Sequence, residues 1–402
     1  MAVVMVEQET GERFPMIVDA DGLPDPASNE WLLSRRGSSG NTLLRNAREL
    51  DLLVSWLAEF RIDFVARIRS EWVFTEAQLK GSLVERLRHS VKRSNVPEAS
   101  SVQHRLVPVS AETFNQRLTT VKAFFGWSFD LELGQLSSKD PMRERIEEHK
   151  AHVEETLARA FVSEPGSSTA LVKDLEDTQL ESFRDIVSYR NPDAYGVNKH
   201  VRFRNYVASM ILLRYGLRLG ELLSLRVEDI FFGRISEIGV VRRPEDLNDT
   251  RRPRPKVKRL ARQLPLDEPN FTRELAEYIE VHREAMMEAG DAADHDYLIV
   301  SDEGAPLHSN SLAQYFRIIR ARFPDSLPST LSAHMLRHTF STRTDRQLFE
   351  DGRSEAERKQ ILAGLRGDSS LDSQDVYVRQ ENIRRGKESL RAYHEKLLTP
   401  EF

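Results

Sequence analysis

Two arginines stand in otherwise apolar segments, each three residues from another polar side chain. Arg218 precedes Glu221 in GLRLGELLSL, and His334 precedes Arg337 in HMLRHTF; on a helix, such pairs project from one face. Each pair alone is typical of a structural ion pair or a satisfied core histidine. Two arginines in apolar surroundings, however, each need an anion, because desolvation of an unpaired charge is costly. One phosphate group would serve both, which predicts phosphate chemistry.

Length and composition bound the class of protein. The 402 residues exceed one ordinary domain, which has roughly 150 residues, and 40% hydrophobic with 30% charged residues is ordinary for a globular chain. The absence of cysteine excludes disulfides and thiolate metal sites and fits a reducing compartment. No segment has the ~20 apolar residues of a membrane span, and the N-terminus lacks signal-peptide features. We therefore expect a cytoplasmic protein with no membrane partner.

The charge of the chain is unevenly distributed. A net charge of −5 argues against a protein that coats nucleic acid by bulk attraction. Residues 251–262, however, read RRPRPKVKRLAR and hold seven basic residues and no acid. Alone, such a run is typical of a solvated face or flexible loop.

Hydrophobic periodicity predicts a helical domain in the first part of the chain. Residues 1–41 are rich in turn-forming residues and read as an irregular N-terminal extension of unknown role. Residues 42–163 show four amphipathic helical patterns, one of them opened by Thr75 and Gln78 in a capping-box spacing. Pro, Gly and Ser then cluster in residues 164–170, which we interpret as a linker.

Residues 171–402 are predicted to form a second domain, mostly helical with one small antiparallel β-sheet. Short apolar patches on either side of the basic run, ISEIGVV and RQLPL, predict the strands. Helical patterns occur at 175–189, 199–224, 270–289, 309–322, 334–349, 354–364 and about 380–397. The predicted fold class is therefore mainly α.

These residues resemble the motifs of the tyrosine recombinases, also called the phage integrase family. Arg218 and Glu221 are similar to the first catalytic arginine and its supporting acid, and His334 and Arg337 to the family's His-x-x-Arg pair. Tyr377, in VYVRQ, lies where the nucleophilic tyrosine is expected, ahead of a final helix. The resemblance implies a catalytic domain over the second part of the chain and, more weakly, a core-binding domain over the first helical part.

The resemblance also gives the basic run a role at DNA. Lys258 is similar to the hairpin lysine that acts as general acid, with Lys256 as its rival. Local positive charge there would supply phosphate contacts that the acidic total does not. The residues expected to contact DNA are Arg251, Arg252, Arg254, Lys256, Arg259 and, outside the run, Arg366.

One position departs from the family pattern. Nine residues before Tyr377, where the family usually has His or Trp, LRGDSS offers Asp368. A carboxylate repels a phosphate unless it is protonated or matched by cations. Three outcomes stay open: Arg366 takes over the phosphate contact, Asp368 orients His334 or an arginine, or activity is reduced.

The function implied by the resemblance is that of a site-specific recombinase or integrase. Such an enzyme breaks and rejoins double-stranded DNA through a 3′-phosphotyrosyl bond, without metal, cofactor or ATP. Guanidinium forks hold the non-bridging oxygens as charge develops, and nearby cations favour loss of the phenolic proton. The resemblance further implies a specific recombination site, a mobile genetic element as setting, and four protomers that assemble on two sites through a C-terminal docking helix.

Two alternatives stay open at this point. The first is a DNA-binding accessory protein of the same fold, catalytically weak because Asp368 spoils the site. The second is an enzyme similar to a type IB topoisomerase, which uses the same arginine and tyrosine chemistry to relax supercoils without strand exchange.

Overall fold

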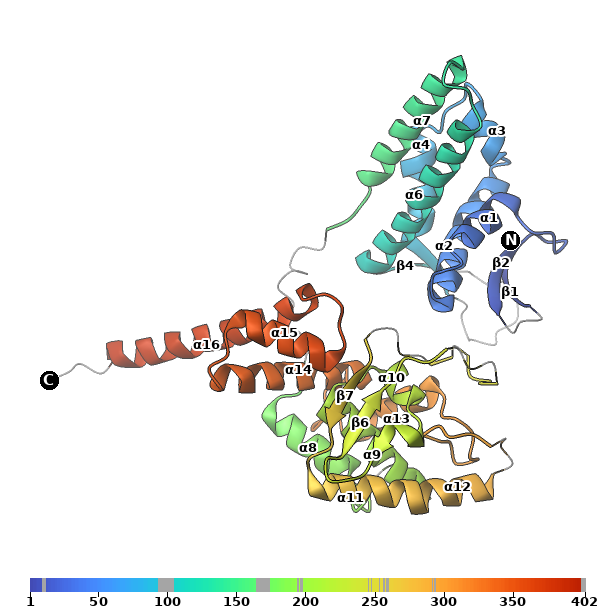
Figure 1. Ribbon diagram of the computed structural model, residues 1–402. Helices are drawn as coiled ribbons and strands as arrows, with labels where there is room; N and C mark the ends of the chain where they lie inside the picture. The colour runs from blue at the N-terminus through green and yellow to red at the C-terminus, as the bar shows by residue number, and fades with distance from the viewer. Residues whose placement is uncertain are drawn as a thin grey trace. The chain divides into compact units, whose positions relative to one another are not determined.

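The computed structural model divides into two compact units, Met1–Thr169 and Ala170–Phe402, each with its own hydrophobic core (Figure 1). The linker predicted at residues 164–170 lies outside the described residues. The structure describes residues 1–8, 12–92, 105–163, 174–193, 195, 198–244, 246, 248–252, 254, 255, 257, 260–290, 292 and 294–398.

The first unit is helical, with two short antiparallel hairpins, β1–β2 and β3–β4. The segment from α4 to α5 is one continuous helical stretch with a π-helical middle, Leu79–Val84. In chain order the elements are β1 (Ala2–Glu7), β2 (Arg13–Val18), α1 (Pro26–Ser34), α2 (Gly40–Glu59), α3 (Phe64–Arg69), α4 (Glu76–Gln78), α5 (Glu85–Arg88), β3 (His89–Lys92), β4 (Arg105–Pro108), α6 (Ala111–Gly134) and α7 (Pro141–Ala158).

The described residues among the first 41 are not irregular, which corrects the expectation from their turn-rich sequence. They form β1, β2, α1 and the start of α2, and Phe14 and Trp31 are buried in the core of the helical unit. The ring of Trp31 meets that of Phe124 in α6 edge to face, with centroids 6.0 Å apart. The polar residues that suggested loops serve as caps: Asp25 accepts the backbone N–H of Ser28 at 3.0 Å and opens α1. The capping box predicted at Thr75 is confirmed.

A buried histidine should make the first unit sensitive to acid. His149 of α7 is 2% exposed, and its Nε2 accepts a 2.9 Å hydrogen bond from the backbone N–H of Phe74. Burial is the main cause that lowers the pKa of His149 from 6.5 to about 4. The unfolded chain therefore takes up this proton at a higher pH than the folded chain. We expect the stability that neutral His149 provides to be present above a pH of about 6.5 and to be lost as the pH falls toward about 4.

Thermal unfolding of the full chain across this pH interval checks the expectation. His149→Gln removes the titrating ring and keeps an amide oxygen that can accept from Phe74, so the variant should lose much of the pH dependence of the first unit. His308→Gln, which changes an exposed histidine of the second unit, is the control and should keep the wild-type slope. Equal slopes for wild type and His149→Gln would contradict the assignment.

The second unit is mostly helical around one small sheet, which confirms the predicted fold class. The described part contains no helix long and apolar enough to cross a bilayer. Its elements are α8 (Asp177–Val187), α9 (Lys199–Tyr215), α10 (Leu219–Ser224), a 3-10 turn (Val227–Asp229), β5 (Ile230–Phe231), β6 (Glu237–Val240), β7 (Arg262–Pro265), α11 (Pro269–Glu277), a π-helical turn (Tyr278–Arg283), α12 (Glu284–Ala289), α13 (Ser309–Arg322), α14 (Ala333–Glu350), α15 (Glu355–Arg366) and α16 (Asp372–Leu398).

The three strands β5, β6 and β7 form one antiparallel sheet with β6 in the middle. Ile238 of β6 pairs with Ile230 on one side and Leu264 on the other, and all three side chains are buried. The basic run lies in the connection from β6 to β7. The sheet thereby fixes both ends of that connection.

Two helix boundaries differ from the prediction. The pattern at 199–224 is two helices, because Gly216 ends α9 in the left-handed region with φ +58°, where its N–H donates to Leu212 O at 3.1 Å. Arg218 is consequently the extended N-cap residue of α10. The last helix begins at Asp372 rather than near residue 380, so Tyr377 lies inside α16 and not ahead of it.

Candidate active site

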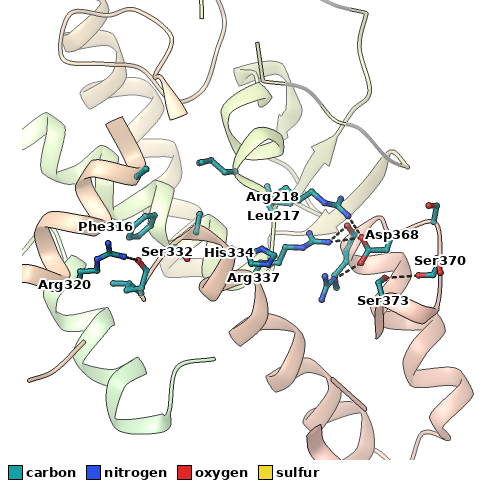
Figure 2. A pocket seen from close by; sticks show the side chains of 16 residues that line it. Leu217, Arg218, Phe316, Arg320, Ser332, His334, Arg337, Asp368, Ser370 and Ser373 are labelled. Carbon is teal, nitrogen blue, oxygen red and sulfur yellow. Dashed lines mark hydrogen bonds and ion pairs between the residues drawn. The ribbon is translucent and has the colours of Figure 1, made fainter. Parts of the chain in front are cut away.

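A cavity of about 770 Å³ lies in the second unit, between α10, α13, α14 and the turn from α15 to α16 (Figure 2). One part of its lining is apolar and includes Leu217, Leu219, Ala313, Phe316 and Leu331. The other part carries ionisable side chains, namely Arg218, His334, Arg337, Arg366 and Asp368. Most of the residues predicted to do chemistry therefore meet in one place.

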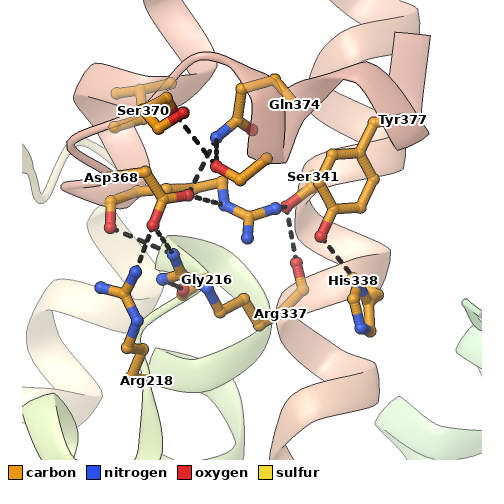
Figure 3. A network of polar contacts seen from close by, with 12 residues as sticks. Gly216, Arg218, Arg337, His338, Ser341, Asp368, Ser370, Gln374 and Tyr377 are labelled. Carbon is orange, nitrogen blue, oxygen red and sulfur yellow. Dashed lines mark hydrogen bonds and ion pairs between the residues drawn. The ribbon is translucent and has the colours of Figure 1, made fainter. Parts of the chain in front are cut away.

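The carboxylate of Asp368 joins three arginines from separate segments (Figure 3). Its Oδ1 accepts from Nη2 of Arg218 and from Nη2 of Arg337, the latter at 3.2 Å. Its Oδ2 accepts from Nε of Arg366 and from Nε2 of Gln374, both at 2.9 Å. Burial alone would raise the pKa of Asp368, but Gln374 and the arginines hold this pKa below its usual value. The residue is therefore an ionised anion in the middle of the arginine cluster.

Glu221 holds the arginine cluster from behind. Its side chain is 1% exposed and lies outside the lining of the cavity. It accepts Nη1 of Arg218 at 2.8 Å and Nη2 of Arg262 at 2.8 Å. Burial alone would raise the pKa of Glu221, but Arg262 and Arg218 keep this pKa below its usual value. The predicted supporting role of Glu221 thus has a geometric basis, and Arg262 of β7 is a second partner that the sequence did not indicate.

Arg337 is fixed by the backbone of two neighbouring segments. Nη1 donates to Gly216 O at 2.6 Å, and Nη2 donates to Arg366 O at 3.2 Å as well as to Asp368. Burial, together with the charges of Arg366 and Arg218, lowers the pKa of Arg337 to about 9. The group is still a cation at neutral pH, and its fork is held in one orientation before any ligand arrives.

Tyr377 lies beside this cluster and is 1% exposed. Its ring is covered by the guanidinium of Arg366, whose Cζ lies 4.6 Å from the ring centroid. Its hydroxyl is 2.7 Å from Nδ1 of His338 (Figure 3). Tyr377 therefore contacts Arg366 of the cluster and His338 of α14, although it is not among the side chains that line the cavity.

His338 is a site residue that sequence reasoning missed. Burial, followed by the nearby His334 and arginines, lowers the pKa of His338 to about 4, so the ring is neutral at pH 7. In the neutral tautomer that carries its hydrogen on Nε2, Nδ1 accepts the hydrogen of the Tyr377 hydroxyl. Its ring also meets that of His334 at 4.1 Å. The available signal was position, because His338 follows Arg337 directly and stands one helical turn after His334.

A buried carboxylate ties the helix of Tyr377 to the helix of Arg337. Glu381 stands one turn after Tyr377 on α16 and accepts Nε of Arg385 at 2.9 Å. It also forms an ion pair of 3.7 Å with Arg346 of α14. This contact links α16 to the helix that carries both histidines.

Comparison with known proteins agrees with this geometry. Residues 173–351 match the phage integrase family. The second unit contains a phage integrase family domain. The resemblance read from the motifs is thereby confirmed, although the matched region ends before Asp368 and Tyr377. No curated protein matches the chain.

Two solved structures share the fold at low sequence identity. The XerH site-specific recombinase, in a post-cleavage complex with a palindromic difH substrate, aligns with a TM-score of 0.56 and 16% identity over 90% of this chain and 83% of that chain. The Tn1549 transposon integrase, in complex with circular intermediate DNA, aligns with a TM-score of 0.51 and 19% identity over 87% of this chain and 93% of that chain. At these identities the likeness establishes the fold.

Arg251, in the basic run of the phage integrase family domain, is a structural arginine. Arg251 is 1% exposed and its Nη2 pairs with Asp249 at 2.9 Å. Its Nη1 donates to Leu223 O at 2.8 Å, and its guanidinium stacks on Tyr297 with Cζ 4.3 Å from the ring centroid. The structure places Arg251 inside the protein, so it is not on a surface that DNA could touch. A charge run in the sequence does not distinguish such an arginine from the half-buried Arg252 and Arg254.

The other residues of the run are partly described. Arg252 and Arg254 are half-buried, and each donates to Asp249 O, at 2.6 Å and 2.9 Å. Lys256, Lys258 and Arg259 lie outside the described residues, so the choice between the two lysines as general acid is unchanged. In the described part of the chain, no group of three or more His, Asp or Glu is placed to hold a metal ion.

Proposed function

We propose that the chain is a site-specific DNA recombinase or integrase with Tyr377 as its nucleophile. One observation carries the proposal: Arg218 and Arg337, from separate segments of the phage integrase domain, converge on a single anionic oxygen of Asp368. Such a convergence is a site for a shared anion, and a backbone phosphate of DNA is the anion that this chemistry needs. Tyr377 lies under Arg366, which binds the same carboxylate.

The proposed reaction is an in-line displacement at phosphorus. The Tyr377 oxygen forms a bond to phosphorus while the bond to the 5′ oxygen breaks, which leaves a 3′-phosphotyrosyl link. Neutral His338, 2.7 Å from the hydroxyl, is placed to accept the phenolic proton. The resemblance assigns protonation of the 5′ oxygen to Lys258. Attack by a second DNA hydroxyl then reverses the bond changes and reseals the strand, while Arg218 and Arg337 hold the charge on the non-bridging oxygens.

The first unit and the end of α16 have proposed roles in assembly. The recombinase and the integrase that share the fold were both solved with DNA, which supports double-stranded DNA as the partner and residues 42–163 as a second DNA-contacting region. Beyond Glu381 the described side chains of α16 are mostly exposed, including Leu390 at 52%, and the helix extends past α14 and α15 (Figure 1). This fits an arm that docks on a neighbouring protomer in a tetramer on DNA.

A second candidate function rests on Asp368 itself. Because its carboxylate already occupies the three arginines, the site could bind DNA and fail to cleave it. The chain would then be an accessory DNA-binding protein of the same fold.

Covalent trapping tests the proposal and separates it from the accessory role. The full chain is incubated with a randomised pool of duplexes that carry single nicks, so that the cleaved end diffuses away and the adduct persists. We expect an adduct that survives denaturation, a protease fragment of it that contains Tyr377, and an enriched DNA sequence among the trapped duplexes. Binding without any adduct would favour the accessory role. Relaxation of supercoiled DNA without strand exchange would favour the topoisomerase-like alternative.

A further inference from the structure

Asp368 is placed by a turn that has no room for a side chain at the preceding residue. Gly367 ends α15 in the left-handed region with φ +64°, and a Cβ there would lie 2.5 Å from Arg262 Nη1 and 3.1 Å from Leu260 O. The N–H of Asp368 then donates to Ala363 O at 2.9 Å. The left-handed turn at Gly367 therefore places the Asp368 carboxylate beside the arginines.

The two oxygens of Asp368 face different partners. Oδ1 binds Arg218 and Arg337, the two forks that the proposed function assigns to the DNA phosphate. Oδ2 binds Arg366 and Gln374, which stand beside Tyr377 on the α15 and α16 side. The bridging position between the two phosphate-binding forks is thus filled by a carboxylate oxygen.

The carboxylates of Glu221 and Asp368 bind different nitrogens of Arg218, Nη1 and Nη2. Asp368 lines the cavity, whereas Glu221 is buried outside the cavity lining. Glu221 can therefore keep its contacts while a ligand enters, and Asp368 cannot keep its Oδ1 contacts if the ligand binds both forks.

We propose that Asp368 is a built-in competitor of the DNA phosphate, with Oδ1 in the place of a non-bridging phosphate oxygen. This inference rests on the proposed function. A phosphodiester and a carboxylate are both anions, and they repel each other when they share two guanidinium groups. Substrate binding therefore requires Oδ1 to leave Arg218 and Arg337.

The hydrogen bonds of Oδ2 can hold the Asp368 carboxylate after Oδ1 has left Arg218 and Arg337. Rotation of the side chain toward Arg366 and Gln374 releases Oδ1 and retains both bonds of Oδ2, so the charge of Asp368 stays paired. The displacement still opposes phosphate binding, so contacts elsewhere on the DNA must offset it. Asp368 thereby weakens phosphate binding at the two arginines. The site then favours duplexes that make many other contacts over isolated phosphates.

The test uses inorganic sulfate as a probe that needs no cleavage. Asp368→Asn keeps the shape and removes the charge, and we expect it to bind sulfate at least about tenfold more tightly than wild type, which corresponds to about 1.4 kcal/mol. The measurement is the sulfate-dependent rise in unfolding temperature of the full chain. Asp375→Asn removes the same charge from an exposed residue of α16 that pairs with Lys359, and it should leave sulfate affinity unchanged. Asp368→Ser, a smaller uncharged side chain, is the second variant and should behave as Asp368→Asn does.

The outcomes separate this inference from the proposed function. Tighter sulfate binding together with faster covalent trapping on nicked duplexes supports both. Tighter sulfate binding without an adduct from any variant supports the competitor and overturns the cleavage chemistry. Unchanged or weaker sulfate binding overturns the competitor. A crystal of the wild-type chain soaked with sulfate gives a further check, because sulfate between Arg218 and Arg337 with Asp368 still on both forks would also overturn it.

Discussion

Replacing Tyr377 with phenylalanine should abolish covalent attachment to DNA, by at least about 10⁴-fold, while duplex binding changes less than about twofold. The substitution removes one oxygen, and the ring keeps its place under Arg366. Among the described residues the hydroxyl makes one hydrogen bond, to His338, so the loss of folding free energy should be about 1 kcal/mol. The measurement is trapping on nicked duplexes, with DNA binding and thermal unfolding of the same preparations.

Tyr206→Phe is the matched control for this substitution. Its hydroxyl also makes a hydrogen bond to one side chain, Glu274, at 2.5 Å, and Tyr206 lies on α9 away from the cavity lining. We expect Tyr206→Phe to lose at least as much stability, because its hydroxyl donates to a charged carboxylate, and to keep full trapping activity. An adduct formed by Tyr377→Phe would remove Tyr377 from the mechanism, whatever the other residues do.

The elements of the fold followed from the sequence where local signals are strong. Periodicity and short apolar patches predict the strands flanking the basic run and the helix at Ser309–Arg322. The break at Gly216 was missed because apolar residues continue at helical spacing across it, and only the turn conformation shows that the helix ends. Residues 1–41 were misread for the opposite reason, since their short strands carry few periodic positions among many caps and turns.

The site was predicted in part, by motif rather than by geometry. The structure brings together Arg218, Glu221, Arg337 and Asp368, all of which the sequence had singled out. Arg262 and Gln374 were missed because their roles depend on tertiary contacts, with Glu221 and Asp368 respectively, which spacing in the sequence does not predict. Arg251 was misassigned because burial of an arginine is decided by its partners in space, here Asp249 and Tyr297.

Asp368 shows what tertiary contacts add to a motif. The sequence leaves open whether Arg366 takes over the phosphate contact, Asp368 orients His334 or an arginine, or activity is reduced. In the structure Asp368 binds Arg218 and Arg337, which agrees with the second possibility, and Arg366 binds Asp368, so a phosphate contact of Arg366 stays a prediction. The sign of its effect on cleavage depends on which side of the forks the carboxylate occupies, and this is a property of three-dimensional structure alone.

Replacing Glu221 with glutamine should destabilise the second unit by roughly 3 kcal/mol and slow strand cleavage by about 100-fold. The carboxylate is buried between Arg218 and Arg262, with Arg337 at 3.9 Å. Its loss leaves Arg218 and Arg337 with Asp368 as their carboxylate partner, and Arg262 with its bond to Leu365 O. Arg218 would also lose the contact that orients its fork. Because the pKa of Glu221 is held below its usual value of 4.5, its contribution is present above a pH of about 4.5 and is lost as the pH falls through the lowered pKa. Unfolding of wild type and variant across this interval should therefore give curves that converge at low pH.

Glu355→Gln is the control, because Glu355 forms an exposed ion pair with Lys359 at 2.7 Å that should contribute less than about 1 kcal/mol. Glu221→Gln and Asp368→Asn remove the same charge from the same arginine cluster, yet we expect opposite effects on cleavage. Glu221 supports the forks from behind, whereas Asp368 occupies the face that the phosphate must reach. If both substitutions slowed cleavage to the same extent, the net charge of the arginine cluster would explain their effect on the cleavage rate. The position of each carboxylate would then not matter.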